Sequence, residues 1–142
     1  MDESTPQIPV KSEVVNLLKD AGITPTQQRI EIAQILFAQP QHLSAEQILS
    51  QVNREQALVS KATVYNTLGL FASRGLIREV IIDPSKVFYD SNIMPHHHFF
   101  NVDTGMLKDF DSSSVQIEHL PRPPEGTITD GVDIIIRIRN VQ

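Results

Sequence analysis

Residues 60–75 read Ser-Lys-Ala-Thr-Val-Tyr-Asn-Thr-Leu-Gly-Leu-Phe-Ala-Ser-Arg-Gly and are the most informative stretch of the chain. Apolar residues recur there at spacings of three and four, which predicts a helix with one buried stripe. The stripe consists of Val64, Leu68, Phe71 and Ala72. Ser60 stands where an N-cap is expected, and Gly75 stands just past the helix end, where glycine is favoured.

The opposite face of this helix carries short hydrogen-bonding side chains, an aromatic ring and a cation, but no carboxylate. These residues are Lys61, Thr63, Tyr65, Asn66 and Thr67. A helix in the major groove of DNA reads base edges with side chains of this kind. An ordinary amphipathic helix also has a polar outer face, so the pattern alone leaves both interpretations open.

The residues after the helix favour the DNA-binding interpretation. Residues 76–82 and 87–90 read as two strands around a turn with proline at its second position. A helix followed by glycine and a hairpin is the outline of a winged helix-turn-helix. From Arg54 to Arg78, four basic residues stand against one acidic residue, a net charge of +3, whereas the whole chain has −5. A basic stripe on an acidic protein is typical of a DNA-binding face.

The expected fold class is α+β, with a winged helix-turn-helix at residues 1–90 and a small α/β domain at residues 96–142. Residues 1–10 are expected as a mobile arm and residues 91–95 as a hinge. Helices are expected at 13–20 with Ser12 as N-cap, at 24–38, and at 44–53 with a capping box, with a connector at 39–42. In the second domain, strands are expected at 96–102, 106–110 and 132–138, with a short helix at 115–120. A domain of this size buries few apolar residues and often gains the rest of its hydrophobic core by dimerising.

Length and composition restrict the class of protein. A chain of 142 residues with 40% hydrophobic and 20% charged residues is ordinary for a soluble globular protein. No apolar run approaches the roughly 20 residues of a membrane helix, and no signal peptide is evident. The chain contains no cysteine, which excludes disulfides and thiolate zinc sites. A cytoplasmic protein without a membrane partner is expected.

Three consecutive histidines, His96, His97 and His98, are the main chemical signal. In a strand, His96 and His98 would project from one face and His97 from the other. Two imidazoles on one face make half of a site for a first-row metal. Asp90 and His42 could supply a third and a fourth ligand. Alternatively, the run is a surface feature and His42 only solvates or caps a connector.

Four motifs, in this order, resemble those of the ferric uptake regulator family. They are Thr26-Gln-Gln-Arg29, His42-Leu-Ser-Ala-Glu46, Ala62-Thr-Val-Tyr65, and a His96-x-His98 strand that ends in Asp103-x-Gly105. The resemblance covers roughly residues 14–139. It implies a dimer with an N-terminal winged helix, a hinge, a C-terminal dimerisation domain and a sensor metal that bridges the two domains. The implied sensor ligands are His42, Asp90, His96 and His98, and His97 matches one ligand of a second site.

The chain also departs from the family pattern. The family's structural zinc needs two Cys-x-x-Cys pairs; Asn101 and Thr104 replace the first pair, so a Cys₄ zinc is excluded. Tyr89-Asp90, where many members place a glutamate before the aspartate, resembles the peroxide-sensing and related branches. The string at residues 96–105 and the absence of cysteine look most like the iron response regulator branch, which implies a response to iron status through haem.

The predicted function is a homodimeric, metal- or haem-responsive transcription regulator, a repressor that binds an inverted-repeat operator in double-stranded DNA. Its effector would be Fe²⁺ or Mn²⁺, with Zn²⁺ also compatible, or haem. Base or positioning contacts are expected from Ser60, Thr63, Tyr65 and Asn66, and phosphate contacts from Arg54, Lys61 and Arg74. Two alternatives are a His/carboxylate metalloenzyme and a DNA-binding dimer without an effector. The enzyme is disfavoured because no nucleophile, general acid or phosphate-cradling loop accompanies the histidines.

Overall fold

The computed structural model of the chain describes residues 10–94 and 96–142. The arm expected at residues 1–10, apart from Val10, and the hinge residue Pro95 lie outside the described residues. The chain divides into two compact units, residues 1–93 and 94–142, and the division falls within the segment expected as the hinge. Within the described residues, none of the helices combines the length and the apolar character needed to cross a membrane.

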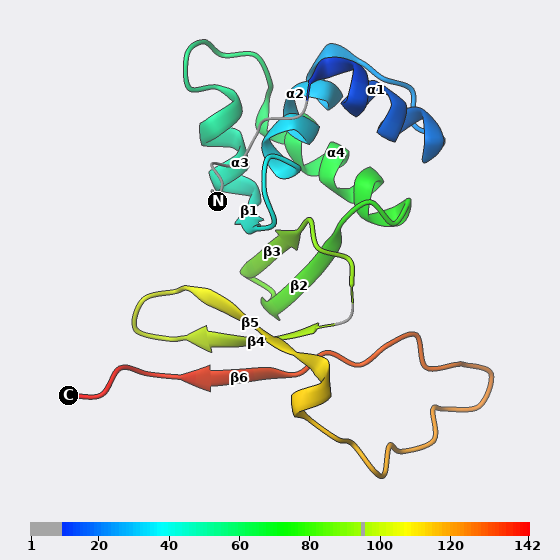
Figure 1. The fold of residues 1–142 in the computed structure, drawn as a ribbon, viewed down its shortest axis with the longest axis vertical. Coiled ribbons are helices and arrows are strands. Elements are labelled where there is room, and N and C mark those ends of the chain that lie inside the picture. The colour runs from blue at the N-terminus through cyan, green and yellow to red at the C-terminus, as the bar shows by residue number, and fades with distance from the viewer. Residues whose placement is uncertain (1–9, 95) are drawn as a thin grey trace, which may run out of the picture. The chain divides into compact units, whose positions relative to one another are not determined.

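The first unit combines helices with a small antiparallel sheet, as expected of a winged helix (Figure 1). Its elements are α1 (Lys11–Asp20), α2 (Gln27–Leu36), β1 (His42–Ser44), α3 (Ala45–Val52), α4 (Lys61–Ser73), β2 (Arg78–Asp83) and β3 (Lys86–Asp90). The strands are ordered β1-β3-β2, so β3 is central. The hairpin of β2 and β3 is the expected wing.

Helices α1 to α4 surround one apolar core. Its fully buried members include Leu18, Ile32, Leu36, Ile48, Leu68 and Phe71. The stripe predicted for α4 is confirmed, since Val64, Leu68 and Phe71 are buried and Ala72 packs against them. The placement of Thr67 on the polar face was wrong. Thr67 follows Val64 by three residues, so helical spacing turns it toward the core, where it is only 5% exposed.

Both predicted ends of α4 are confirmed. The Ser60 Oγ accepts a hydrogen bond of 3.1 Å from the Thr63 backbone N–H, as an N-cap should. Gly75 follows the helix with φ +76°, a conformation that glycine adopts without a Cβ clash. The start and the end of the helix that carries Tyr65 are therefore defined by local sequence.

Replacing Ser60 by alanine should destabilise the first unit by about 1 kcal/mol, because one orphan N–H of α4 loses its acceptor. In urea unfolding, the midpoint should fall while the slope stays constant. Ser50→Ala is the matched control, since Ser50 lies on an exposed position of α3 and caps nothing. Equal midpoints for Ser60→Ala and the wild type would contradict the cap.

Three boundaries in the first unit differ from the prediction. Helix α1 begins at Lys11 rather than Glu13, because the Glu13 carboxylate reaches back to accept the Val10 N–H at 3.1 Å. Val10, not Ser12, is therefore the N-cap residue. Helix α2 begins after the Thr26 cap and ends at Leu36. The connector expected at 39–42 runs into β1, a strand of three residues that the prediction missed.

The second unit contains a three-stranded sheet with β4 at its centre. Its elements are β4 (His96–Asn101), β5 (Leu107–Asp111), the short 3₁₀ turn η1 (Ser112–Ser114) and β6 (Ile135–Ile138). Strand β4 pairs antiparallel with β5 and parallel with β6. The first two predicted strands are confirmed within one residue. Together, the two units form the expected α+β fold.

The helix predicted at residues 115–120 was wrong. Residues 115–134, all of them described, lie outside any helix or strand. Ile117 and Leu120 stay 45% and 54% exposed, so no apolar stripe packs a helix there, and Pro121 blocks its continuation. The last strand begins at Ile135 rather than Val132. The Ile134 N–H, just before it, bonds to the His97 ring of β4 at 3.2 Å instead of to a backbone carbonyl of that strand.

Candidate metal centre and DNA-binding face

The sheet of the first unit places an imidazole beside a carboxylate. His42 at the start of β1 and Asp90 at the end of β3 are register partners in the antiparallel pair. Side chains of such partners lie on the same face, about 5 Å apart at Cβ. Asp90 is only 1% exposed, and its Oδ1 accepts the Asn92 N–H at 2.8 Å. A buried carboxylate oriented by a backbone N–H is typical of a metal ligand.

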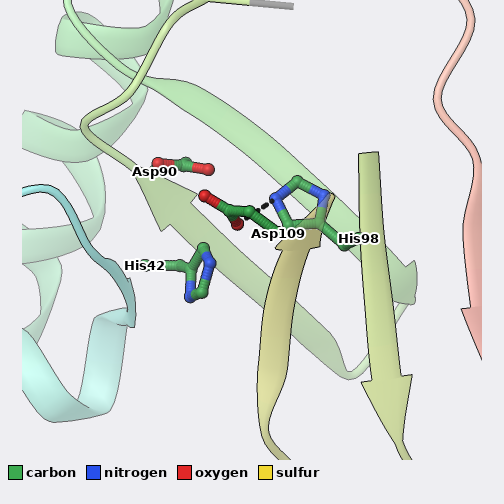
Figure 2. Close-up of side chains that lie close together, drawn as sticks. All are labelled: His42, Asp90, His98 and Asp109. Carbon is green, nitrogen blue, oxygen red and sulfur yellow. Dashed lines mark ion pairs between the residues drawn. The ribbon is translucent and has the colours of Figure 1, made fainter. Parts of the chain in front are cut away.

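The sheet of the second unit brings two imidazoles and another carboxylate together. His96 and His98 share one face of β4, are 8% and 2% exposed, and have ring centroids 4.6 Å apart. The Asp109 carboxylate on β5 lies 3.3 Å from the His98 Nε2 and 3.6 Å from the His96 Nε2. Figure 2 shows His98 and Asp109 facing each other, and also the pair of His42 and Asp90.

The tautomer of His96 fits metal binding. Its Nδ1 lies 2.6 Å from the Met94 carbonyl oxygen, which can only accept, so Nδ1 carries the proton. In the neutral ring, Nε2 is then an acceptor that faces the Asp109 carboxylate, which is also an acceptor. A backbone carbonyl on the other ring nitrogen commonly orients a metal-bound histidine.

Asp109 was not among the predicted ligands. It faces the histidines because the β4–β5 register pairs His98 with Asp109. The predicted turn could not have revealed it, since extending an antiparallel hairpin outward from residues 103–105 pairs His98 with Phe110, and the observed register is shifted by one residue. Each unit therefore supplies one group of potential ligands: His42 and Asp90 in the first, and His96, His98 and Asp109 in the second.

His97 points to the other face of β4, as predicted. Its Nδ1 accepts the Ile134 N–H, and its ring packs 5.6 Å from that of Phe110. The part of the chain that the structure describes holds no group of three metal-ligating side chains around His97. The second metal site suggested for His97 stays a prediction.

Asn101 and Thr104, which stand where the resemblance would place the first cysteine pair, take part in a group of hydrogen bonds. The Asn101 Oδ1 accepts the N–H groups of Asp103 and Thr104 at 2.9 and 3.2 Å. The Asn101 Nδ2 donates to the Asn140 Oδ1 at 2.8 Å, and Asp103 accepts the Asn140 N–H at 2.9 Å. These bonds tie the β4–β5 turn to the segment after β6 without a metal.

The exposed face of α4 carries most of the residues predicted to contact DNA. Lys61, Tyr65 and Asn66 are exposed, and the Lys61 Nζ lies 5.9 Å from the centroid of the Tyr65 ring. Thr63 is half-buried, with its hydroxyl 3.0 Å from the Ser60 Oγ. Arg54 is exposed in the loop after α3, which the Asn53 side chain holds by accepting two backbone N–H groups.

Ser60 and Arg74, also predicted to contact DNA, make hydrogen bonds within the protein. The Ser60 hydroxyl caps α4, as described above. Arg74 lies at the opposite end of α4, where its guanidinium donates to the Ala21 and Gly22 carbonyl oxygens at 3.2 Å. Arg74 thereby satisfies carbonyls at the end of α1.

One feature of this face was missed because it joins two helices. The Tyr65 hydroxyl donates a hydrogen bond of 2.9 Å to the Glu46 carboxylate in the first turn of α3. The face therefore contains a carboxylate, contrary to the pattern of α4 alone. The hydrogen bond that Glu46 accepts from the hydroxyl raises the pKa of Tyr65 above its ordinary value of 10.0, with smaller contributions from burial and from the charge of Glu46.

Replacing Glu46 by glutamine should lower the pH at which Tyr65 ionises. The hydrogen bond favours the neutral phenol, so its stabilisation is complete at neutral pH and is lost as the pH rises through the pKa of Tyr65. Ultraviolet absorbance of the phenolate measures this directly. The only other tyrosine, Tyr89, has a pKa raised mainly by burial, and a Tyr65→Phe variant isolates its titration. Identical Tyr65 titrations with and without Glu46 would rule out the bond.

Comparison with known proteins agrees with the class of protein that this fold and these residues define. The family model described as "Ferric uptake regulator family" matches residues 20–124. The chain belongs to the ferric uptake regulator family. This is a family of transcription regulators rather than of enzymes, which argues against the metalloenzyme alternative.

Relatives and solved structures extend this finding. The peroxide-responsive repressor PerR of Staphylococcus aureus (strain Mu50 / ATCC 700699) is 31% identical over 98 residues, which are 69% of this chain and 66% of the repressor, just under two thirds of its length. The ferric uptake regulator from Pseudomonas aeruginosa with manganese has a TM-score of 0.66 at 24% identity, covering 89% of this chain and 97% of that chain. The regulator from Francisella tularensis with iron has a TM-score of 0.68 at 24% identity, covering 84% and 92%. These structures support the fold.

Proposed function

We propose that this family member is a homodimeric repressor whose affinity for an inverted-repeat operator is controlled by one divalent metal bound to both units. The ligands would be His42 and Asp90 from the first unit and His96, His98 and Asp109 from the second. The observation that carries the proposal is the Asp109 carboxylate, which faces the Nε2 atoms of two buried histidines on β4.

The donor set favours a particular group of metals. Three imidazoles and two carboxylates offer nitrogen and oxygen ligands without sulfur, which suits Fe²⁺ and Mn²⁺. Zn²⁺ binds the same donor types but usually takes four ligands in a tetrahedron. We therefore rank Fe²⁺ and Mn²⁺ first. When bound, the metal would supply a link between the two units, and its free energy of binding would favour the arrangement that brings all five ligands together.

Haem is the second candidate effector, because the chain resembles the iron response regulator branch. His97 could hold it only after the hydrogen bond from the Ile134 N–H to its Nδ1 broke, because a neutral ring that accepts at Nδ1 carries its proton on Nε2 and offers iron no lone pair there. Optical titration with haem distinguishes the two effectors. Saturable haem binding that His97→Ala removes would favour haem, and its absence alongside saturable Mn²⁺ binding would favour the metal.

The DNA contacts would come from α4 and the loop before it. Tyr65, Asn66 and Thr63 are proposed to face base edges, and Lys61 and Arg54 to contact phosphates. The N-terminal end of α4 would approach the DNA, where its N–H groups favour phosphate. Ser60 and Arg74 contribute chiefly by capping helices, given their contacts within the protein.

The protein should sediment as a dimer of about twice 15.9 kDa at micromolar concentration. The second unit has a sheet of three short strands, and Ile136 and Ile138 on its edge strand β6 are each 38% exposed. An edge strand with exposed apolar residues is a ready surface for a second chain. A monomer that binds an inverted repeat tightly would contradict this expectation.

Selection of duplexes from a randomised library, with Mn²⁺ or with a chelator, tests the proposed function. The expected result is enrichment of an inverted repeat under only one of the two conditions. Enrichment of the same repeat under both would favour a DNA-binding dimer without an effector. No enrichment under either condition would contradict the proposal.

A further inference from the structure

A carboxylate lies against the tyrosine proposed to read DNA. Glu46 belongs to the first turn of α3 and Tyr65 to α4, and the packing of these helices brings the Tyr65 hydroxyl within 2.9 Å of the Glu46 Oε2. Both side chains are exposed, so the pair lies on the surface. An exposed carboxylate at a DNA interface repels phosphates. The position of Glu46 beside Tyr65 therefore calls for a functional explanation.

The hydrogen bond fixes what the Tyr65 hydroxyl can offer to a ligand. A phenol has one proton to donate and lone pairs that accept, whereas an ionised carboxylate only accepts. Tyr65 must therefore be the donor to Glu46, and its single proton is used within the protein. The part of the hydroxyl that remains for an outside partner is an acceptor.

We propose that Glu46 is a positioning residue that restricts Tyr65 to recognising an amino group on a base, either cytosine N4 or adenine N6 in the major groove. This inference rests on the proposed function and specifies which bases Tyr65 would recognise in the operator. Cytosine and adenine present an amino donor in the major groove, while thymine O4, guanine O6 and guanine N7 are acceptors. An acceptor base would place lone pairs against the lone pairs of Tyr65 and would be rejected.

Lys61 compensates for the charge of the pair. Its Nζ lies 5.9 Å from the centroid of the Tyr65 ring, one helical turn before it on α4. A cation at this position offsets the repulsion between Glu46 and the phosphates. The three side chains can therefore combine general attraction to DNA with discrimination at one base.

The test uses the whole 142-residue chain with Mn²⁺ and with a chelator, and the inverted-repeat duplex enriched from the randomised library. Each adenine of the duplex is replaced in turn by purine, which lacks the N6 amino group, and each cytosine by 2-pyrimidinone, which lacks the N4 amino group. At one position in each half-site, the wild type should lose roughly 2- to 10-fold in affinity, the range for one hydrogen bond. Tyr65→Phe should be insensitive to the replacement at that position.

Glu46→Ala should relax the choice of base at the same position. Without its acceptor, the hydroxyl can rotate to donate to thymine or guanine, so the ratio of affinities for amino and keto bases should approach one. Glu55→Ala is the matched control: it removes an exposed carboxylate from the same unit, in the loop after α3, and should leave the ratio unchanged. The ratio, unlike overall affinity, does not respond to a general change in charge.

Three results would overturn the inference. They are sensitivity to amino deletion that persists in Tyr65→Phe, an unchanged ratio in Glu46→Ala, and a wild-type preference for thymine or guanine at the position that depends on Tyr65. Each leaves the proposed regulator standing, because an operator would still have been enriched. A library that shows no enrichment would contradict the proposed function itself, and the inference with it.

Discussion

Replacing His96 and His98 together by alanine should abolish saturable binding of Mn²⁺. Both buried imidazoles that face Asp109 are lost, and one histidine and two carboxylates remain of the five proposed ligands. The affinity should fall by more than about 100-fold, since loss of even an outer-shell partner costs about 10- to 100-fold. Calorimetric titration measures the affinity, and operator binding should become independent of Mn²⁺.

This variant has two controls. His119→Ala removes an exposed histidine that lies outside the strands, and it should bind Mn²⁺ like the wild type. Replacing His96 and His98 by glutamine keeps polar side chains in β4 and separates loss of metal from loss of packing. Circular dichroism and sedimentation should show a folded dimer in each case. A double variant that still responds to Mn²⁺ with unchanged dependence would mean that His96 and His98 are buried packing residues and not metal ligands.

Tyr65→Ala should weaken binding to the enriched duplex by about 1–3 kcal/mol, with a much smaller loss on a scrambled duplex. The reason is that base contacts carry specificity, whereas phosphate contacts act on every sequence. Lys61→Ala should therefore weaken both duplexes alike and reduce the slope of log K against log salt by roughly one unit. Binding isotherms at several salt concentrations measure both effects. Unchanged sequence preference in Tyr65→Ala would make Tyr65 a packing residue.

Helix α4 could be predicted in detail because its determinants are local. Ser60, Gly75 and the apolar stripe of α4 lie within one continuous stretch, and cap chemistry and helical periodicity act over a few residues. Thr67 was wrongly assigned to the polar face because the prediction gave the polarity of its side chain more weight than its helical spacing from Val64. The helix expected at residues 115–120 failed for a related reason: helix-compatible residues do not form a helix without an apolar face to bury.

The features that the prediction missed depend on pairing across the chain. Strand β1 exists because His42 pairs with Asp90, far away in sequence, and three residues carry little periodic signal. Asp109 joins the histidines only through the β4–β5 register. The bond from Tyr65 to Glu46 depends on how α3 packs on α4. The proposed ligands His42, Asp90, His96 and His98 were predicted from residue type and resemblance, and they lie as two pairs, one in each unit.

The affinity for the enriched inverted repeat, measured at constant salt with saturating Mn²⁺ and with a chelator, tests the central claim most directly. The account predicts dissociation constants that differ by about 5- to 150-fold, the usual range of coupling between two sites. Because coupling is reciprocal, the duplex should change the affinity for Mn²⁺ by the same factor. Equal dissociation constants under the two conditions, in protein shown to bind Mn²⁺, would contradict metal control of DNA binding.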